Sequence, residues 1–152
     1  MPERTWILTG SPENLAVTRA HDFTVVGAKE RRRRQALEIE QGDRIVFYVT
    51  RVMAFAASVR VAGEMFEDRT PLWPGKPGKA DPYPWRFPTT PEWVLEEADW
   101  IAAQTLVDSL EHIAKWPREH WKLAFQGQLR TVSEHDAQLL CERLAAAAAV
   151  AA

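Results

Sequence analysis

Two adjacent strand-forming segments in the middle of the chain constrain its fold more than any other feature. Residues 44–49, RIVFYV, are rich in the β-branched and aromatic residues that favour strands. Residues 54–64 follow after a short connection, and apolar side chains occupy every second position from Phe55 to Val61. The pattern predicts two long strands, with the alternating side chains of the second strand on one face of a sheet.

Shorter elements surround these two strands. Ser11-Pro12-Glu13 is typical of a helix start, with a hydroxyl cap, a proline at the first helical position and an acid in the first turn. Ser133 opens a last helix in a similar way, and residues 103–110 predict a modest helix. Further short strands are expected at 5–8, 23–26, 85–87, 123–125 and 129–131. Because strands and helices mix without a βαβ rhythm, this order predicts an α+β barrel.

The segment 69–83 holds four prolines and two glycines and cannot form a regular element. A loop of this length inside a compact domain is more often functional than idle. It carries Trp73 and leads into Tyr83-Pro-Trp85-Arg86-Phe87. Aromatic faces stack on bases and arginine forks match phosphates, so these residue types favour a nucleic acid or a nucleotide as ligand.

Charge is unevenly distributed along the chain. The net charge is −2, yet residues 1–91 carry +3 and residues 92–152 carry −5. Six acids and no bases occupy residues 92–111. The positive excess is concentrated in Lys29, Arg31, Arg32, Arg33 and Arg34. These residues predict one basic patch for a polyanion, with a solvated helix face as the alternative interpretation.

The 152 residues fit a single domain, 1–152, with enough length for a core of its own. The one cysteine, Cys141, excludes an internal disulfide. No apolar run approaches the ~20 residues that a bilayer span needs, and the first residues lack the apolar core of a signal peptide. We therefore expect a cytoplasmic protein without membrane contact.

No motif for covalent or metal catalysis is present. The sequence lacks a nucleophile elbow, a P-loop, a glycine-rich dinucleotide turn and a zinc-protease helix motif. Its four histidines are widely scattered, and Cys141 follows two leucines in an apolar helix. We therefore expect no metal, no cofactor and no catalytic residue, and a binding protein rather than an enzyme.

Several short motifs, taken in order, resemble those of EVE domains, which belong to the PUA-like superfamily. They span about residues 5–145, and their order rather than any single motif carries the resemblance. The resemblance implies a PUA-like, curved mixed β-barrel flanked by helices. The matching segments are Trp6-Ile-Leu8, Ser11-Pro-Glu-Asn14, Gly27-x-x-Glu30-Arg31, Gln41-Gly-Asp43, Ile45-Val-Phe-Tyr48, Phe66-Glu-Asp68, Thr70-Pro71, Tyr83-Pro84 with Arg86, and Phe125-Gln-Gly127 with Leu129-Arg130.

The resemblance also implies kinship with YTH domains, which read N6-methyladenine in RNA, and with readers of modified DNA bases. In such readers one base leaves the strand and enters a pocket with aromatic walls. Carried over by position, the base pocket would contain Ser11, Asn14, Thr24, Val26, Gly27, Trp73, Tyr83 and Trp85. Phosphates would be bound by Lys29, Arg31, Arg32, Arg33, Arg34 and Arg86. We therefore expect a non-catalytic domain that binds DNA or RNA carrying a modified base.

One position departs from the family pattern. Many relatives have a tryptophan directly before the glycine that corresponds to Gly27, as one wall of an aromatic cage, whereas this chain has Val26. We expect Trp73 or Trp85 to provide the stacking wall instead.

Two other function classes stay open from the sequence. Some PUA-like relatives of the ASCH group resemble hydrolases of modified nucleosides that use a lysine, a threonine and a glutamate, and Lys29, Thr24 and Glu30 are of the right types. Alternatively, the acidic segment 92–111 would make the chain a protein-interaction module.

Overall fold

The computed structural model describes residues 3–75 and 78–151. Within them lies one sheet made of β1 (Thr5–Gly10), β2 (Val25–Ala28), β3 (Arg44–Val49), β4 (Ala54–Val61), β5 (Phe66–Glu67), β6 (Trp85–Val94), β7 (Ile101–Ala102) and β8 (Leu129–Val132). The α-helices are α1 (Pro12–Ala20), α2 (Arg33–Ala36), α3 (Glu111–Ala114) and α4 (Glu134–Ala151). The 3-10 helices are η1 (Glu30–Arg32), η2 (Glu97–Asp99), η3 (Ala103–Leu106) and η4 (Arg118–Phe125).

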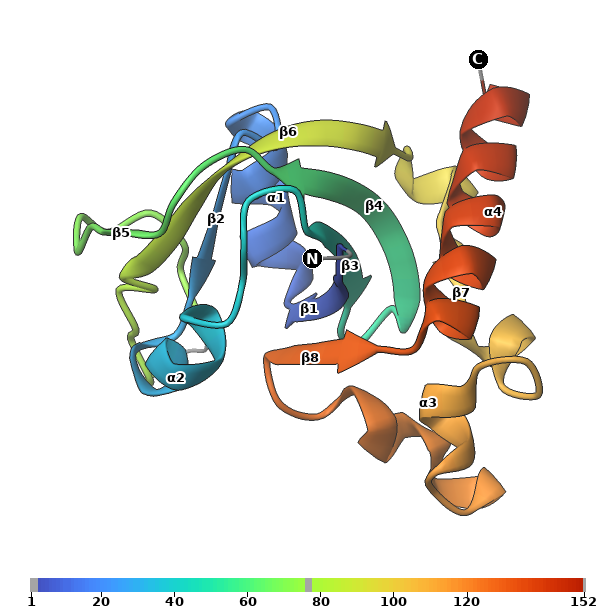
Figure 1. Ribbon diagram of the computed structural model, residues 1–152. Helices are drawn as coiled ribbons and strands as arrows, with labels where there is room; N and C mark the ends of the chain where they lie inside the picture. Colours follow the sequence, from blue (N-terminus) through green and yellow to red (C-terminus); the bar gives the residue numbers. More distant parts are fainter. Residues whose placement is uncertain (1–2, 76–77, 152) are drawn as a thin grey trace.

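The sheet curls into a half-barrel with helices around it (Figure 1). Its strand order is β2-β6-β4-β3-β1-β8, with β5 on β6 and β7 on β4. The β1–β3 pair is parallel and the other pairs are antiparallel. In Figure 1, α2 lies at the gap between β2 and β8, and α4 runs along the opposite side beside β7. The α+β class and the curved, mixed sheet flanked by helices are thus confirmed.

Both faces of the sheet are covered because alternate side chains enter two separate cores. On β1, Trp6 and Leu8 join one cluster, and Ile7 joins the other. The first cluster combines side chains from six strands with Leu15 of α1, so it fills the inside of the curl. The second packs the outer face against α3, η4 and α4, with Leu140 among its fully buried side chains.

A β-bulge interrupts the expected alternation of side chains on β4. The pairing runs from Phe47 opposite Ala57 to Tyr48 opposite Phe55, which leaves Ala56 as an extra residue. Phe55 therefore packs in the outer core, whereas Ala57 packs in the inner one. The prediction that the side chains from Phe55 to Val61 share one face was wrong for this reason.

The strand expected at 85–87 is present but longer than predicted, because β6 continues through two prolines. At Pro88 the carbonyl still takes part in the pairing, because it accepts a hydrogen bond from the Ala62 amide at 2.8 Å. Pro91 lies where the register with β4 shifts, and a ladder bond is interrupted at such a point.

Three other local expectations differ from the structure. Residues 123–125 end the 3-10 helix η4 instead of forming a strand, and of residues 103–110 only Ala103–Leu106 are helical. The second strand begins two residues later than expected and contains Gly27. The start of α1 at Ser11 and the absence of helix or strand from the described part of 69–83 are confirmed.

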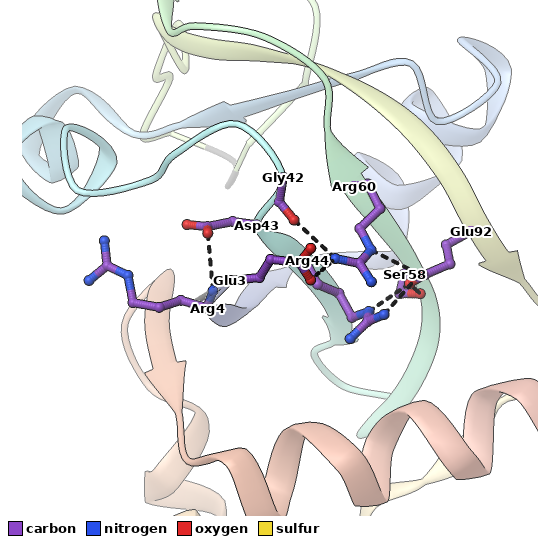
Figure 2. A network of polar contacts seen from close by, with 8 residues as sticks. All are labelled: Glu3, Arg4, Gly42, Asp43, Arg44, Ser58, Arg60 and Glu92. Carbon is purple, nitrogen blue, oxygen red and sulfur yellow. Dashed lines mark hydrogen bonds and ion pairs between the residues drawn. The ribbon is translucent and has the colours of Figure 1, made fainter. Parts of the chain in front are cut away.

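A network of charged side chains joins β3, β4 and β6 on one side of the sheet (Figure 2). Arg44 binds Glu92 with two nitrogens, at 2.7 and 2.9 Å. Arg60 Nε and Ser58 Oγ donate to the same carboxylate at 3.0 and 2.9 Å. Burial raises the pKa of Glu92, but these hydrogen bonds outweigh burial and lower it from 4.5 to about 2.

The lowered pKa predicts that Glu92 stabilises the fold above pH 4.5 and that this contribution disappears as the pH falls towards 2. Replacing Glu92→Gln should lower the free energy of unfolding at neutral pH by about 3 kcal/mol. The variant should also lose most of the acid-dependent decline between these pH values. Urea unfolding at several pH values measures both effects, with Glu96→Gln as the control because Glu96 is 81% exposed. An identical pH profile in Glu92→Gln and the parent would contradict this prediction.

Candidate nucleic-acid interface

A small cavity lies where the parallel strands β1 and β3 both end and α1 begins. We call it the inner cavity. Its volume is about 40 Å³, little more than one water molecule occupies in the liquid. It is lined by Leu8, Thr9, Gly10, Ser11, Asn14, Leu15, Thr18, Val26, Gly27, Phe47, Tyr48, Val49, Trp73, Tyr83 and Gln128. The lining is mostly apolar, so the inner cavity suits a small apolar group rather than a whole base.

A larger outer cavity of about 360 Å³ adjoins it, in the size range of ligand sites. The two share Thr9, Gly10, Ser11, Asn14, Tyr83 and Gln128, so they are adjacent, and we refer to them together as the hollow. Lys29 and Arg31 bring positive charge to the outer cavity, and Phe125 brings an aromatic ring.

The loop before β6 closes one side of both cavities, and α1 holds it through side chains. Asn14 accepts a hydrogen bond from the Gly75 amide and donates one to the Tyr83 hydroxyl, both at 3.0 Å. The Trp73 indole donates to the Thr18 hydroxyl at 2.9 Å. These bonds replace the strand ladder that the proline-rich loop does not form.

The two aromatic rings of the loop form the wall. The rings of Trp73 and Tyr83 meet edge to face, with their centroids 5.8 Å apart. A Cβ on Gly27 would lie 2.6 Å from the Trp73 ring, so only glycine lets the indole lie against β2. Burial raises the pKa of Tyr83, which keeps its hydroxyl protonated at neutral pH.

Gln128 closes the side of the hollow between β2 and β8. Its side-chain oxygen accepts the Lys29 amide at 2.7 Å, and its side-chain nitrogen donates to the Gly27 carbonyl at 3.2 Å. Its own carbonyl accepts the Thr9 amide at 2.7 Å. The buried Gln128 side chain thus bonds to β2 as a neighbouring strand would.

The structure brings together six of the eight residues proposed for the base pocket. Thr24 lies outside both cavities, exposed and bonded to the His21 carbonyl. Trp85 also lines neither cavity, because its ring lies beneath Arg33 and Arg69 and its indole donates to the Glu30 carbonyl. The six that line the inner cavity are Ser11, Asn14, Val26, Gly27, Trp73 and Tyr83.

The six residues proposed to bind phosphate occupy different surroundings. Lys29 and Arg31 line the outer cavity, and Arg32 reaches its edge beside Gly127. Arg33 covers Trp85. Arg34 is exposed and lines neither cavity.

Arg86 is buried inside the loop rather than on an open surface. Its guanidinium is only 4% exposed and donates to the carbonyls of Tyr83, Pro82 and Thr70. It also pairs with Asp68 at 3.3 Å. The Arg86 guanidinium therefore holds the loop through these bonds, and it has no open face for a phosphate.

The trio proposed for a hydrolase does not meet in one cavity. Of Thr24, Lys29 and Glu30, only Lys29 lines the hollow. Glu30 forms an ion pair with Arg69, whose hydrogen bonds lower the pKa of Glu30. A glutamate with a lowered pKa is poorly suited to general acid catalysis at neutral pH.

The acidic segment 92–111 does not form one uniform surface. Glu92 is held in the network with Arg44, and Asp108 pairs with Arg118. Glu96 remains largely exposed beside Arg19.

Across the described residues, no helix is long and apolar enough to cross a membrane.

Gln128 lines the hollow and Arg130 lies next to it beside Gly127, but neither was predicted as a site residue. Both are polar residues beside a matched glycine motif, which was the available signal. Phe125, interpreted as core, is indeed buried but also lines the outer cavity.

The half-barrel and its hollow define the class of protein. The EVE domain family matches residues 4–143, and the chain belongs to this family. No functionally curated protein matches it.

Solved structures share the fold at low sequence identity. The YTH domain of Mmi1, in a complex with RNA, aligns with a TM-score of 0.64 at 9% identity, covering 93% of this chain and 81% of that one. The Pho92 YTH domain, in a complex with m6A, aligns with a TM-score of 0.63 at 10% identity, covering 93% of this chain and 83% of that one. The Pseudomonas syringae protein PSPTO5229 aligns with a TM-score of 0.59 at 14% identity, covering 92% of this chain and 99% of that one. At these identities the likeness shows the fold alone.

The Ser11 hydroxyl caps α1, since it accepts the Asn14 amide at 3.1 Å. We expect Ser11→Ala to lower the free energy of unfolding by about 1 kcal/mol. Nucleic-acid affinity should stay unchanged, because the cap bond already uses this oxygen. Urea unfolding and a binding titration check the two parts, with Ser109→Ala on an exposed turn as the control. Unchanged stability together with weaker binding would make Ser11 a ligand-binding residue instead.

Replacing Gln128→Ala should remove the side-chain hydrogen bonds to the Lys29 amide and the Gly27 carbonyl. Each unsatisfied group costs about 1–3 kcal/mol, and we expect a loss of about 2–4 kcal/mol in unfolding free energy. Hydrogen exchange should accelerate at the Lys29 amide before global unfolding. Gln126→Ala, in the exposed neighbouring position, serves as the control. Unchanged exchange at Lys29 would show that the bridge does not hold β2.

Proposed function

We propose that this EVE domain binds nucleic acid without catalysis and recognises a modified base in the hollow beneath the Trp73–Tyr83 wall. The observation that carries the proposal is the division of this hollow. A larger outer cavity with positive charge on its lining adjoins a small apolar inner one. A base in the outer cavity would direct a small substituent inward.

The chemistry of the lining supports this arrangement. An apolar substituent gains free energy when it leaves water for an apolar cavity, whereas an unmodified base leaves that cavity unfilled. The Tyr83 hydroxyl accepts from Asn14 and keeps its own hydrogen for an acceptor on the base. Aromatic contact with a base contributes about 1–3 kcal/mol.

The structural neighbours support the same ligand class. Two of the YTH domains that share the fold were solved with RNA or with m6A. The basic rim at Lys29 and Arg31 suits a polyanion, so binding should weaken as salt rises. We propose no role for a metal or cofactor.

Binding of short single strands with and without modified bases, including N6-methyladenine, tests the proposal by fluorescence anisotropy. Trp73→Ala should weaken binding of the modified strand by about 1–3 kcal/mol, because Trp73 lines the inner cavity and its ring would contact the substituent there. It should also lower the melting temperature, since the indole is buried and bonded to Thr18. Trp73→Phe keeps an aromatic face and should retain most of the affinity.

Trp85→Ala is the matched control, because Trp85 is equally buried but lines neither cavity. It should leave base discrimination intact. If Trp73→Ala discriminates between modified and unmodified strands as well as the parent does, the base is not read beneath Trp73.

A further inference from the structure

Two arginines from distant parts of the chain converge on Gly127. Arg32 follows β2 in η1, and Arg130 lies on β8. Their Nη2 atoms lie 3.3 and 3.4 Å from the position that a Cβ would take on Gly127. Two positive groups therefore approach the same point on the backbone.

No carboxylate compensates this pair within residues 3–75 and 78–151. Neither Arg32 nor Arg130 takes part in an ion pair there. The Arg32 Nε atom is buried and has no hydrogen-bond partner in the same part of the chain. A buried, unsatisfied donor on a charged group is costly, and it signals a missing acceptor.

The Arg130 side chain is fixed in place by its neighbours. Its Nε donates to the Gln126 carbonyl at 2.8 Å, and its guanidinium lies over the Trp116 ring. The bond at Nε leaves the terminal nitrogens for another acceptor. Gly127 itself has a φ of +84°, a conformation that favours glycine, so no side chain fills the space between the two forks.

We propose that Arg32 and Arg130 together bind one phosphate group beside Gly127. Paired guanidinium forks match the oxygens of a phosphate, and an anion between them removes their mutual repulsion. Gly127 lines the outer cavity, so this phosphate would adjoin the base. In assigning the phosphate to a nucleic-acid strand, the inference rests on the proposed function.

The experiment has one arm that is independent of nucleic acid. In ¹H–¹⁵N spectra of the arginine side chains, inorganic phosphate should shift the Arg32 and Arg130 Nε–H signals in the same titration. The shift at Arg32 should disappear in Arg130→Gln, and the reverse should hold for Arg32→Gln. Arg34→Gln is the matched control, since it removes the same charge from the same arginine run but at an exposed position.

The second arm uses a single-stranded oligonucleotide. Arg32→Gln and Arg130→Gln should each weaken binding about tenfold at low salt and reduce the salt slope by about one. The double variant should lose less than the product of the single effects, because both side chains hold the same phosphate. Arg32→Lys should bind poorly as well, since an ammonium lacks the fork.

The outcomes separate the two proposals. Phosphate shifts without oligonucleotide binding would support the anion site and overturn the proposed function. Oligonucleotide binding that Arg34→Gln weakens as much as Arg32→Gln and Arg130→Gln do would overturn the paired site. An absence of phosphate shifts at both arginines would overturn it as well. Melting temperatures of all variants ensure that only folded protein is compared.

Discussion

The side-chain amide of Gln128 provides the contact on which the functional hollow depends. A curled sheet that stops short of closure leaves β2 and β8 without a shared ladder, and the strand order places them at opposite ends of the sheet. Gln128 bonds to an acceptor in β2, the Gly27 carbonyl, and to a donor directly after it, the Lys29 amide, as a strand residue would. Because a side chain rather than a strand spans this gap, the two edges meet only locally. The outer cavity lies beside that contact and has Lys29 and Gly127 on its lining.

The wall that carries Trp73 and Tyr83 also contains backbone groups without a strand partner, and side chains satisfy them in a different way. Its loop has few main-chain partners, so side chains of α1 and the buried Arg86 satisfy its polar groups. Arg86 donates to three loop carbonyls, and Asn14 bridges Gly75 and Tyr83. The wall is therefore as rigid as these polar bonds make it, and a larger group could enter the inner cavity only if Trp73 and Tyr83 moved apart.

Local chemistry made part of this architecture predictable. Ser11 and Pro12 define a helix start within one turn, and the β-branched run at 44–49 specifies a strand whatever lies around it. The path of β6 through Pro88 depends on a hydrogen bond with Ala62, which no local pattern records. The same applies to the site: the loop aromatic Trp73 was predictable from its setting, whereas Arg130 and Gln128 acquire their roles only from residues about 100 positions away.

In the proposed function, the two cavities separate affinity from selectivity. Phosphate contacts act through charge, so they weaken with salt and are indifferent to the base. The inner cavity carries little charge, and its contribution depends on whether an apolar group fills it. From the sequence we expect Trp73 or Trp85 to supply the aromatic wall that Val26 does not, and the Trp73 ring lies against Gly27, next to Val26 in the chain. The aromatic wall comes from the loop before β6 and the basic rim from Lys29 and Arg31, so separate substitutions can test the two contributions.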